Sequence, residues 1–194
     1  CQLISDVCDE IIAGQWMAAE GLRYAFDALR LRTNIGGFTN WCLNEPWPNG
    51  AGSFIVDYEA CPLPVFYAVG QSMKSISICL KYDSILYDIF DGLKAEIFLV
   101  NDGDSEVEKL HWSYILRDRH GDIYGSGSGV SDIGLLEAKS VSCIDIQPPL
   151  EVRTGPVILE LYLKDSNGDI LTERVYAFGA KGARAPLAGL IKQD

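Results

Sequence analysis

The 194-residue sequence is poor in basic residues. Sixteen lysines and arginines stand against 27 aspartates and glutamates, which gives a formal net charge of −11. Proteins that bind nucleic acid neutralise phosphates with lysine and arginine and carry a basic footprint. This composition therefore argues against nucleic acid as a partner.

Long apolar runs are also lacking. No stretch approaches the roughly 20 consecutive apolar residues that span a bilayer, and no charged-then-apolar leader opens the chain. We therefore expect no membrane partner. The chain begins with Cys1 and runs directly into a periodic segment, so we expect it to be a piece of a longer protein.

Metal-binding patterns are missing as well. The sequence has two histidines, and its six cysteines form no C-x-x-C pair. We expect neither a metal site nor a cofactor, and we interpret the cysteines as mostly buried thiols. An even number of cysteines also permits disulfides, so their redox state stays open. The cysteines are Cys1, Cys8, Cys42, Cys61, Cys79 and Cys143.

What the first part of the chain does have is helical periodicity. Apolar residues over 3–29 recur at helical spacing and predict an amphipathic helix, either continuous or broken near Gly14. A short strand over 37–43 and a second helix over 64–73 follow. One such α/β unit cannot bury both faces of its strand unaided. We therefore expect residues 1–73 to be the end of a larger α/β structure.

From about residue 74 the period changes to the alternation typical of strands. About seven short strands separated by turns predict an antiparallel sandwich of the immunoglobulin type over residues 74–180. We expect residues 181–194 to form a loose tail. The clearest strands are 76–82, 93–100, 110–117, 140–146, 157–164 and 170–178, and the turns include Asn101–Asp104, Arg119–Asp122 and Ser166–Asp169.

Three other features have ordinary interpretations. The alternating glycines and serines of Gly125–Gly129 have no following lysine and helix, so we predict a flexible connection rather than a phosphate-binding loop. Asp165-x-Asn167-x-Asp169 resembles the start of a calcium loop, but Ile170 stands where glycine is needed, so we predict a hairpin turn. His111 is interpreted as a structural strand residue and His120 as an exposed turn residue.

The run Trp41–Gly50 combines two indoles, an amide and a carboxylate. An indole offers a flat apolar face to the C–H side of a pyranose, while amide and carboxylate groups bond its hydroxyls in a partly dry cleft. Trp41, Asn44, Glu45 and Trp47 are therefore candidate sugar-binding residues. The alternative is that both tryptophans are core residues, because large aromatics are mostly structural.

Several segments of the first 73 residues form a recognisable succession: Glu20–Tyr24 with Arg30, then Gly36-Gly37 leading into Trp41-x-Leu43-Asn44-Glu45-Pro46-Trp47-Pro48, then Val56-Asp57-Tyr58, and Pro62-x-Pro64 with Tyr67-Ala68-Val69. This succession resembles glycoside hydrolase family 2, and is most similar to its β-mannosidase and exo-β-glucosaminidase branch. The later segments Val100-Asn101-Asp102 and Val175–Phe178 resemble sandwich strands of the family.

The resemblance implies that residues 1–73 are the last helix–strand–helix of a (β/α)8 barrel, followed by an immunoglobulin-like sandwich. The parent would be a retaining exo-glycosidase acting on β-linked glycosides. Its partners would be the β-linked sugar and the missing upstream barrel and N-terminal domains. The family leans toward a secreted or periplasmic location, which the sequence itself leaves open. A cis peptide between Trp41 and Cys42 is also implied.

The Asn44-Glu45 pair resembles the pair that carries the general acid/base at the end of the fourth barrel strand in the wider clan. Its neighbours here correspond instead to the eighth strand. A retaining glycosidase needs two carboxyl groups about 5–5.5 Å apart, and a complete barrel takes roughly 250 residues. We therefore assign no catalytic residue and expect the isolated chain to be inactive. The alternative function is a non-catalytic carbohydrate- or protein-binding module in which the sandwich is the working part.

Overall fold

The computed structural model describes residues 7–32, 34–48, 54–147 and 155–181. The chain divides into two compact units, Cys1–Lys74 and Ser75–Asp194. Neither of the described helices is long and apolar enough to cross a membrane. The predicted tail lies, apart from Lys181, outside the described residues.

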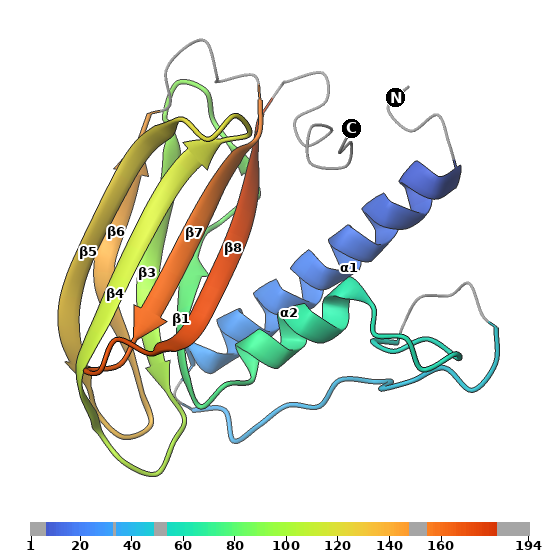
Figure 1. Ribbon diagram of the computed structural model, residues 1–194, viewed down its shortest axis with the longest axis horizontal. Coiled ribbons are helices and arrows are strands. Elements are labelled where there is room, and N and C mark those ends of the chain that lie inside the picture. Colours follow the sequence, from blue (N-terminus) through green and yellow to red (C-terminus); the bar gives the residue numbers. More distant parts are fainter. Residues whose placement is uncertain (1–6, 33, 49–53, 148–154, 182–194) are drawn as a thin grey trace. The chain divides into compact units, whose positions relative to one another are not determined.

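The first unit contains two helices, α1 (Val7–Arg30) and α2 (Pro64–Ser72) (Figure 1). The helices predicted over 3–29 and 64–73 are both confirmed. α1 continues through Gly14, because one glycine costs only about 1 kcal/mol in a helix interior. Pro64 occupies the first turn of α2, where its missing amide proton leaves no hydrogen bond unmade. The two helices share a small apolar core formed by Ala19, Phe26, Ile55, Val65 and Val69.

One side of α1 carries buried charged residues. Glu20, Arg23, Asp27 and Arg30 follow each other at three- and four-residue spacing and are each at most 9% exposed. Arg23 forms an ion pair with Glu20. Arg30 donates to the carbonyl oxygen of Ser72, the last residue of α2, where the helix dipole favours a positive charge. Arg30 therefore ties together the C-terminal ends of the two helices.

The predicted strand over 37–43 is wrong. Residues 35–42 adopt no strand, and the segment makes one isolated parallel bridge, between Asn44 and Val56. Leu43 accepts backbone hydrogen bonds from Ile55 and Val56, at 3.2 and 3.0 Å. A strand needs a neighbour along its whole length to satisfy its amides and carbonyls. The described part of this unit supplies such a neighbour at one end of the segment.

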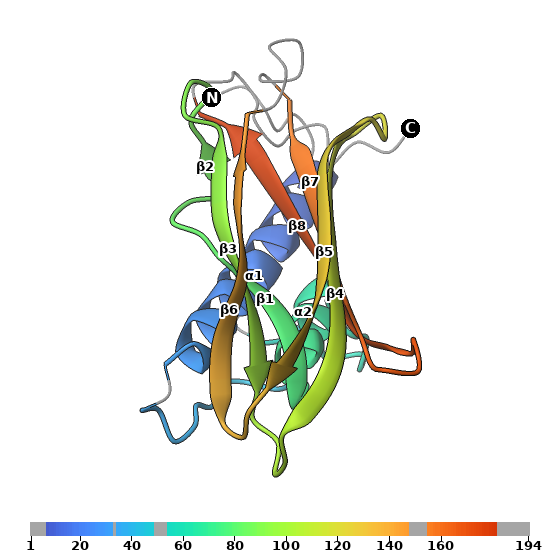
Figure 2. The same ribbon diagram turned by 90° about the vertical axis from the view of Figure 1, so that its left-hand side faces the viewer.

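The second unit is a sandwich of two sheets, and the predicted β-sandwich is confirmed. Figure 2 shows the sheets as separate layers, with β3 and β6 in one and β4 and β5 in the other. One sheet has the order β1 (Ile76–Lys81), β3 (Leu93–Asn101), β6 (Glu137–Ile146). The other has the order β2 (Leu86–Tyr87), β8 (Ile170–Ala180), β7 (Val157–Lys164), β4 (Val107–Asp118), β5 (Ile123–Ile133).

Strand pairing is antiparallel except between β2 and β8, which run parallel. Alternate residues of each strand point into the space between the sheets, so that Leu159, Leu161 and Leu163 of β7 have no exposed surface. Backbone amides on the outer edge of β1 donate hydrogen bonds to side chains of β8. The amide of Ile78 donates to Thr172 Oγ1 at 3.2 Å, and the amide of Leu80 donates to the Tyr176 hydroxyl at 3.1 Å.

The interpretation of Gly125–Gly129 as a flexible connection is wrong, because these residues form the middle of β5. Gly127 lies opposite Tyr114 and Gly129 opposite Trp112 in the β4–β5 ladder. A Cβ atom added at Gly127 would lie 2.5 Å from Tyr114 Cε1, and one at Gly129 would lie 2.6 Å from Trp112 Cζ2. The aromatic rings of β4 thus occupy the space that the glycines leave.

The hairpin turn predicted at Ser166–Asp169 is confirmed. Asp165 Oδ1 accepts hydrogen bonds from the amides of Asn167 and Asp169, both at 2.9 Å, and the Asp165 carbonyl accepts one from Gly168. The carboxylate therefore closes the turn from within. His111 and His120 are both exposed.

The cysteines differ from their interpretation as mostly buried thiols. Among the described cysteines, Cys79 is buried in β1, whereas Cys8, Cys61 and Cys143 are exposed. Cys143 lies on β6 between the exposed Ser140 and Asp145. Free cysteine behaves as a small hydrophobe and is most often buried, so the exposure of these three thiols is decided by their places in the fold and not by residue type.

Candidate functional site

The segment that carries the predicted sugar-binding residues lies in the first unit, between α1 and α2. The peptide bond between Trp41 and Cys42 is cis, as the family resemblance implies. The Asn40 side-chain amide spans this peptide and donates to the carbonyl oxygen of Cys42 at 3.3 Å. The Glu45 amide donates to the Val56 carbonyl at 3.2 Å, which holds the following residues against the segment before α2.

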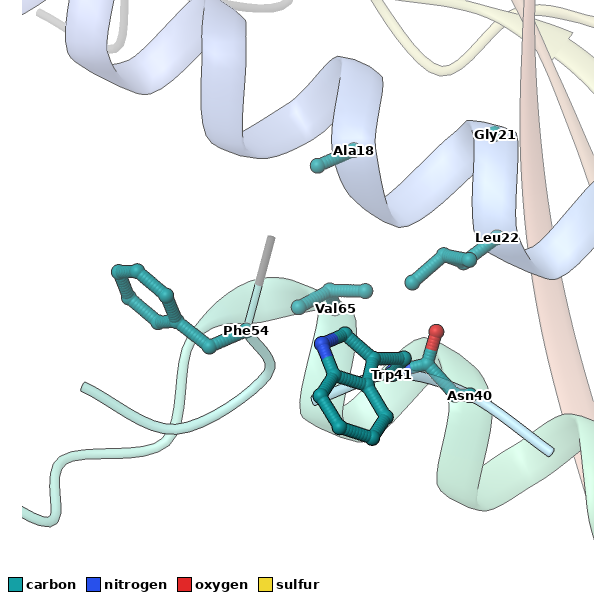
Figure 3. Close-up of a pocket in the computed structure, with 7 residues that line it drawn as sticks. All are labelled: Ala18, Gly21, Leu22, Asn40, Trp41, Phe54 and Val65. Atoms are coloured by element: carbon teal, nitrogen blue, oxygen red, sulfur yellow. The ribbon is translucent and has the colours of Figure 1, made fainter. Parts of the chain in front are cut away.

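Trp41 lines a cavity of about 370 Å³ within this unit. Figure 3 shows the indole together with Leu22 of α1 and Val65 of α2. Trp41 is 85% exposed, so it is not a core residue of the described unit. A mostly apolar hollow beside an accessible indole can pack against the C–H face of a sugar ring. The remaining lining residues are Ala18, Gly21, Asn40 and Phe54.

The other predicted site residues are not gathered around this cavity. Asn44 and Trp47 are exposed, Trp47 to 62%, and neither lines the hollow. Glu45 is only 8% exposed, so most of its side chain is withdrawn from solvent. Asn40, which was not among the residues predicted from the sequence, does line the cavity. Its place one residue before the cis peptide is the signal that would have indicated it.

The carboxylates of Asp57 and Glu59, on the segment before α2, accept hydrogen bonds from neighbouring residues of the same turn. Asp57 Oδ1 accepts hydrogen bonds from the amides of Glu59 and Cys61, at 2.9 and 2.8 Å, and so closes a turn. The Tyr58 hydroxyl donates to Glu59 Oε1 at 3.1 Å, and the bonded Glu59 carboxylate raises the pKa of Tyr58. No group of three or more His, Cys, Asp or Glu side chains in the described ranges is arranged to hold a metal ion.

The side chains that line the cavity offer apolar and hydrogen-bonding contacts. The seven residues that line the cavity offer apolar surface, one indole and one amide, and none of them has an ionisable side chain. Hydrolysis of a glycoside by a retaining mechanism needs both an acid/base and a nucleophilic carboxylate. The described cavity can therefore provide one wall of a sugar site.

Comparisons with solved structures agree with this fold. The exo-chitosanase CsxA of Amycolatopsis orientalis matches 86% of the chain with a TM-score of 0.67 and 17% sequence identity. A β-D-mannosidase from Dictyoglomus thermophilum matches 89% of the chain with a TM-score of 0.66 and 16% identity. No family model and no curated protein matches the chain.

The chain spans about a fifth of the length of these solved structures. The predicted resemblance to glycoside hydrolase family 2 is confirmed at the level of the fold: the chain contains a C-terminal domain like that of the family. At this sequence identity, activity does not follow from the fold.

Proposed function

We propose that the chain is the C-terminal segment of a retaining exo-glycosidase that acts on β-linked glycosides. In this proposal residues 1–73 are the C-terminal end of a (β/α)8 barrel, and residues 74–180 are an immunoglobulin-like sandwich. The strand orders of the two sheets support the second assignment, because immunoglobulin domains pair strands from distant parts of the chain in two such layers.

Apolar side chains of α1 that are exposed in the described unit support the assignment of residues 1–73 to a barrel. Val7, Ile11 and Met17 of α1 are 68%, 54% and 52% exposed. An added Cβ atom at Gly14 would meet nothing within 4 Å. Exposed apolar side chains along one helix indicate a surface that another part of a larger protein covers. Further barrel strands upstream would cover it and would also give residues 37–43 a neighbour.

Trp41 is the observation that carries the proposed function. Its indole is accessible beside an apolar hollow and next to a cis peptide, on a segment that matches the fold of β-glycosidases. We propose that Trp41 forms part of a sugar subsite, with Asn44 and Trp47 on the same exposed segment. Glu45 is the weakest member of this set, because it is buried in the described unit.

The test compares this chain with its complete parent reading frame on aryl β-mannosides, β-glucosaminides and β-galactosides. We expect turnover with retained anomeric configuration by the parent and none by the 194-residue chain, because the chain lacks the acid/base and the nucleophile. Substantial turnover by the chain alone would contradict the proposal.

A variant tests the role of the indole. In the parent, Trp41→Ala should lower kcat/KM at least about fivefold, since loss of an aromatic contact in a sugar site removes about 1 kcal/mol or more of binding. Phe90→Ala removes another exposed aromatic, 74% exposed in the sandwich, and serves as the matched control. An equal loss in both variants would argue against a role for Trp41 in the site.

A further inference from the structure

The turn between β5 and β6, residues 134–137, presents two adjacent leucines to solvent and is called the leucine turn below. Leu135 and Leu136 are 53% and 66% exposed. Leu136 has a φ of 51°, in the left-handed region that glycine adopts without a steric penalty and that bulky residues rarely adopt. Folding of the sandwich alone would therefore favour glycine at position 136, because the leucine gains little burial there.

Hydrogen bonds from neighbouring residues hold the leucine turn in place. The Gly134 amide donates to Glu137 Oε2 at 2.6 Å, and the Gly134 carbonyl accepts from Asn101 Nδ2 at 2.9 Å. Asn101 has no exposed surface, and the same nitrogen donates to the Ser105 carbonyl at 2.8 Å. The two leucines thus stand on a fixed backbone, so a contact at them requires little further ordering of the chain.

The connection between β3 and β4 lies beside the leucine turn, because Asn101 Nδ2 bonds to both. Figures 1 and 2 show the two connections together at the lower end of the sandwich. Residues 102–106 contain no cation and carry three exposed carboxylates, Asp102, Asp104 and Glu106. Lys139, which follows the turn on β6, donates to the carbonyl oxygen of Asp132 at 2.8 Å. The leucines therefore form an apolar surface with an acidic border.

The chain enters the sandwich at this same end. The Asp102 amide donates to the carbonyl oxygen of Ser75, the first residue of the second unit, at 2.9 Å. In the proposed parent, the upstream domains are joined to the sandwich here, which gives them a high effective concentration at the leucine turn. A second copy of the chain is a poorer partner, because two acidic borders brought together repel each other.

We infer that the leucine turn docks onto an upstream domain of the parent, at an apolar depression bordered by lysine or arginine side chains. This inference rests on the part of the proposed function that makes the chain a segment of a longer protein. Leucines seated in such a depression bury apolar area, and its basic border complements the carboxylates of residues 102–106. Burial of the Leu136 side chain also offsets the unfavourable φ of this residue.

The first test measures the exposure of the leucines directly. Hydroxyl-radical footprinting with mass spectrometry gives the oxidation rates of Leu135 and Leu136 in the 194-residue chain and in the complete parent. Ile123, 61% exposed at the opposite end of β5, is the internal control. We expect the ratio of leucine to Ile123 oxidation to be at least about fivefold lower in the parent, because interface cores pack as tightly as protein interiors.

An equal ratio in the two proteins would overturn the inference. A ratio that falls in the isolated chain as its concentration rises would also overturn it, because copies of the chain would then occupy the leucine turn.

Leu136→Gly separates docking from folding. In the isolated chain it should keep or raise the thermal midpoint, since glycine adopts a positive φ freely. In the parent it should increase the oxidation of Leu135, because half of the apolar contact is removed. Val130→Ala shortens another exposed side chain of β5, 58% exposed, and should change neither readout. If Leu135 stayed protected in the Leu136→Gly parent, the leucine turn would not be the docking surface.

The charge of the partner surface is tested by reversing the acidic border. Asp104→Lys combined with Glu106→Lys should increase Leu135 oxidation in the parent, and more strongly at low salt, because salt screens the repulsion between like charges. Glu173→Lys, an exposed change on β8, is the control. Protection that is unchanged by the double reversal would show that the partner surface is not basic, contrary to the inference.

Neither test depends on glycoside turnover. A parent that hydrolyses β-linked glycosides but leaves both leucines reactive would overturn the docking surface and leave the proposed function standing. An inactive parent with protected leucines would do the reverse.

Discussion

At the scale of single residues, three aspartates organise turns of one geometry. In each, Oδ1 of the aspartate accepts the amides two and four residues later, and the residue three positions after the aspartate has a positive φ. The turns begin at Asp57, Asp118 and Asp165. The positive-φ residue is glycine in the two hairpins, Gly121 at 94° and Gly168 at 92°, but it is Ala60, at 64°, in the first unit.

Ala60→Gly should therefore stabilise the first unit. Alanine at positive φ places its Cβ close to the backbone, and relief of that strain outweighs the added entropy of the unfolded chain by about 0.5–1 kcal/mol. Urea unfolding in a Trp112→Phe background checks this, because the remaining tryptophans, Trp16, Trp41 and Trp47, all lie in the first unit. Gly168→Ala, followed by far-ultraviolet circular dichroism because the tryptophans do not report on the sandwich, is the reverse control and should destabilise the second unit. No gain for Ala60→Gly would contradict the prediction.

Asp118 predicts a dependence of stability on pH. Burial raises the pKa of Asp118, but hydrogen bonds from the amides of His120 and Asp122 and from the Tyr124 hydroxyl outweigh it and hold the pKa below its usual 3.8. The unfolded chain then binds the proton more readily than the folded one. This stabilisation is complete above about pH 5 and is lost as the pH falls below about 4 toward the folded value.

Asp118→Asn keeps the acceptor oxygen and removes the charge. We expect it to be less stable than the wild type at pH 7 and the difference to shrink as the pH falls from about 5 to 3. Denaturant melts at four pH values measure this. Asp122→Asn, an exposed change in the same turn, is the control for lost charge. If the stability difference between the wild type and Asp118→Asn stayed constant with pH, the pKa of Asp118 would not be lowered by folding.

At the scale of elements, β5 shows how a glycine-rich strand is kept in place. Gly127 and Gly129 lie against the rings of Tyr114 and Trp112, while Ser126 and Ser128 are exposed on the other side. The rings cover the glycine backbone and supply the packing that the glycines cannot.

Gly129→Ala should cost about 1–3 kcal/mol of unfolding free energy, because the new methyl would lie 2.6 Å from Trp112 Cζ2 and the ring would have to leave its packed position. Ser128→Ala changes the neighbouring, outward position and should alter stability by less than about 0.5 kcal/mol. Chemical denaturation followed by far-ultraviolet circular dichroism compares the two. Equal effects would show that the rings do not use the glycine gap.

α1 offers a prediction of opposite sign. Gly14→Ala should stabilise the isolated chain by about 1 kcal/mol, because alanine is the better helix former and its Cβ meets nothing within 4 Å. In the complete parent, where we propose that other barrel elements cover this surface, the gain should vanish or reverse. A stabilisation of equal size in both proteins would count against a covered α1.

At the scale of the whole molecule, the two units differ in how much core they possess. The sandwich buries eighteen core residues in its described part, whereas the described first unit has a core of five. The first unit also buries five charged residues, Glu20, Arg23, Asp27, Arg30 and Glu45. A small apolar core supplies little stability.

We therefore expect the fragment Ser75–Asp194 to fold alone and the fragment Cys1–Lys74 not to. Near-ultraviolet circular dichroism and a cooperative thermal transition test each fragment. A cooperative transition in the first fragment would show that its core suffices without further barrel strands. Calorimetry of the folded sandwich with β-linked oligosaccharides then tests the alternative binding-module function, for which no heat of binding is expected.

The sequence was enough to predict those helices, strands and turns that depend on interactions between residues close together in the chain. Helical periodicity predicted α1 and α2, alternation predicted most strands of the sandwich, and Asn167-Gly168 predicted a hairpin. The segment 37–43 has the composition of a strand, but a strand exists only beside a partner, and the described unit does not supply one along its length. The glycines of β5 show no alternation of apolar and polar side chains, so the sequence pattern did not predict a strand there. Aromatic rings of the neighbouring strand β4 supply the packing that the glycines lack.

The candidate site divides in the same way. The sequence by itself determined which side chains are available to a sugar on this segment, namely two indoles, amides and carboxylates without a cation, because residue chemistry does not depend on the fold. The tertiary structure decided which of them are presented. Trp41 is exposed beside the hollow and Glu45 is withdrawn, because burial depends on how α1, α2 and the segment between them pack, and that packing is set by contacts distant in the sequence.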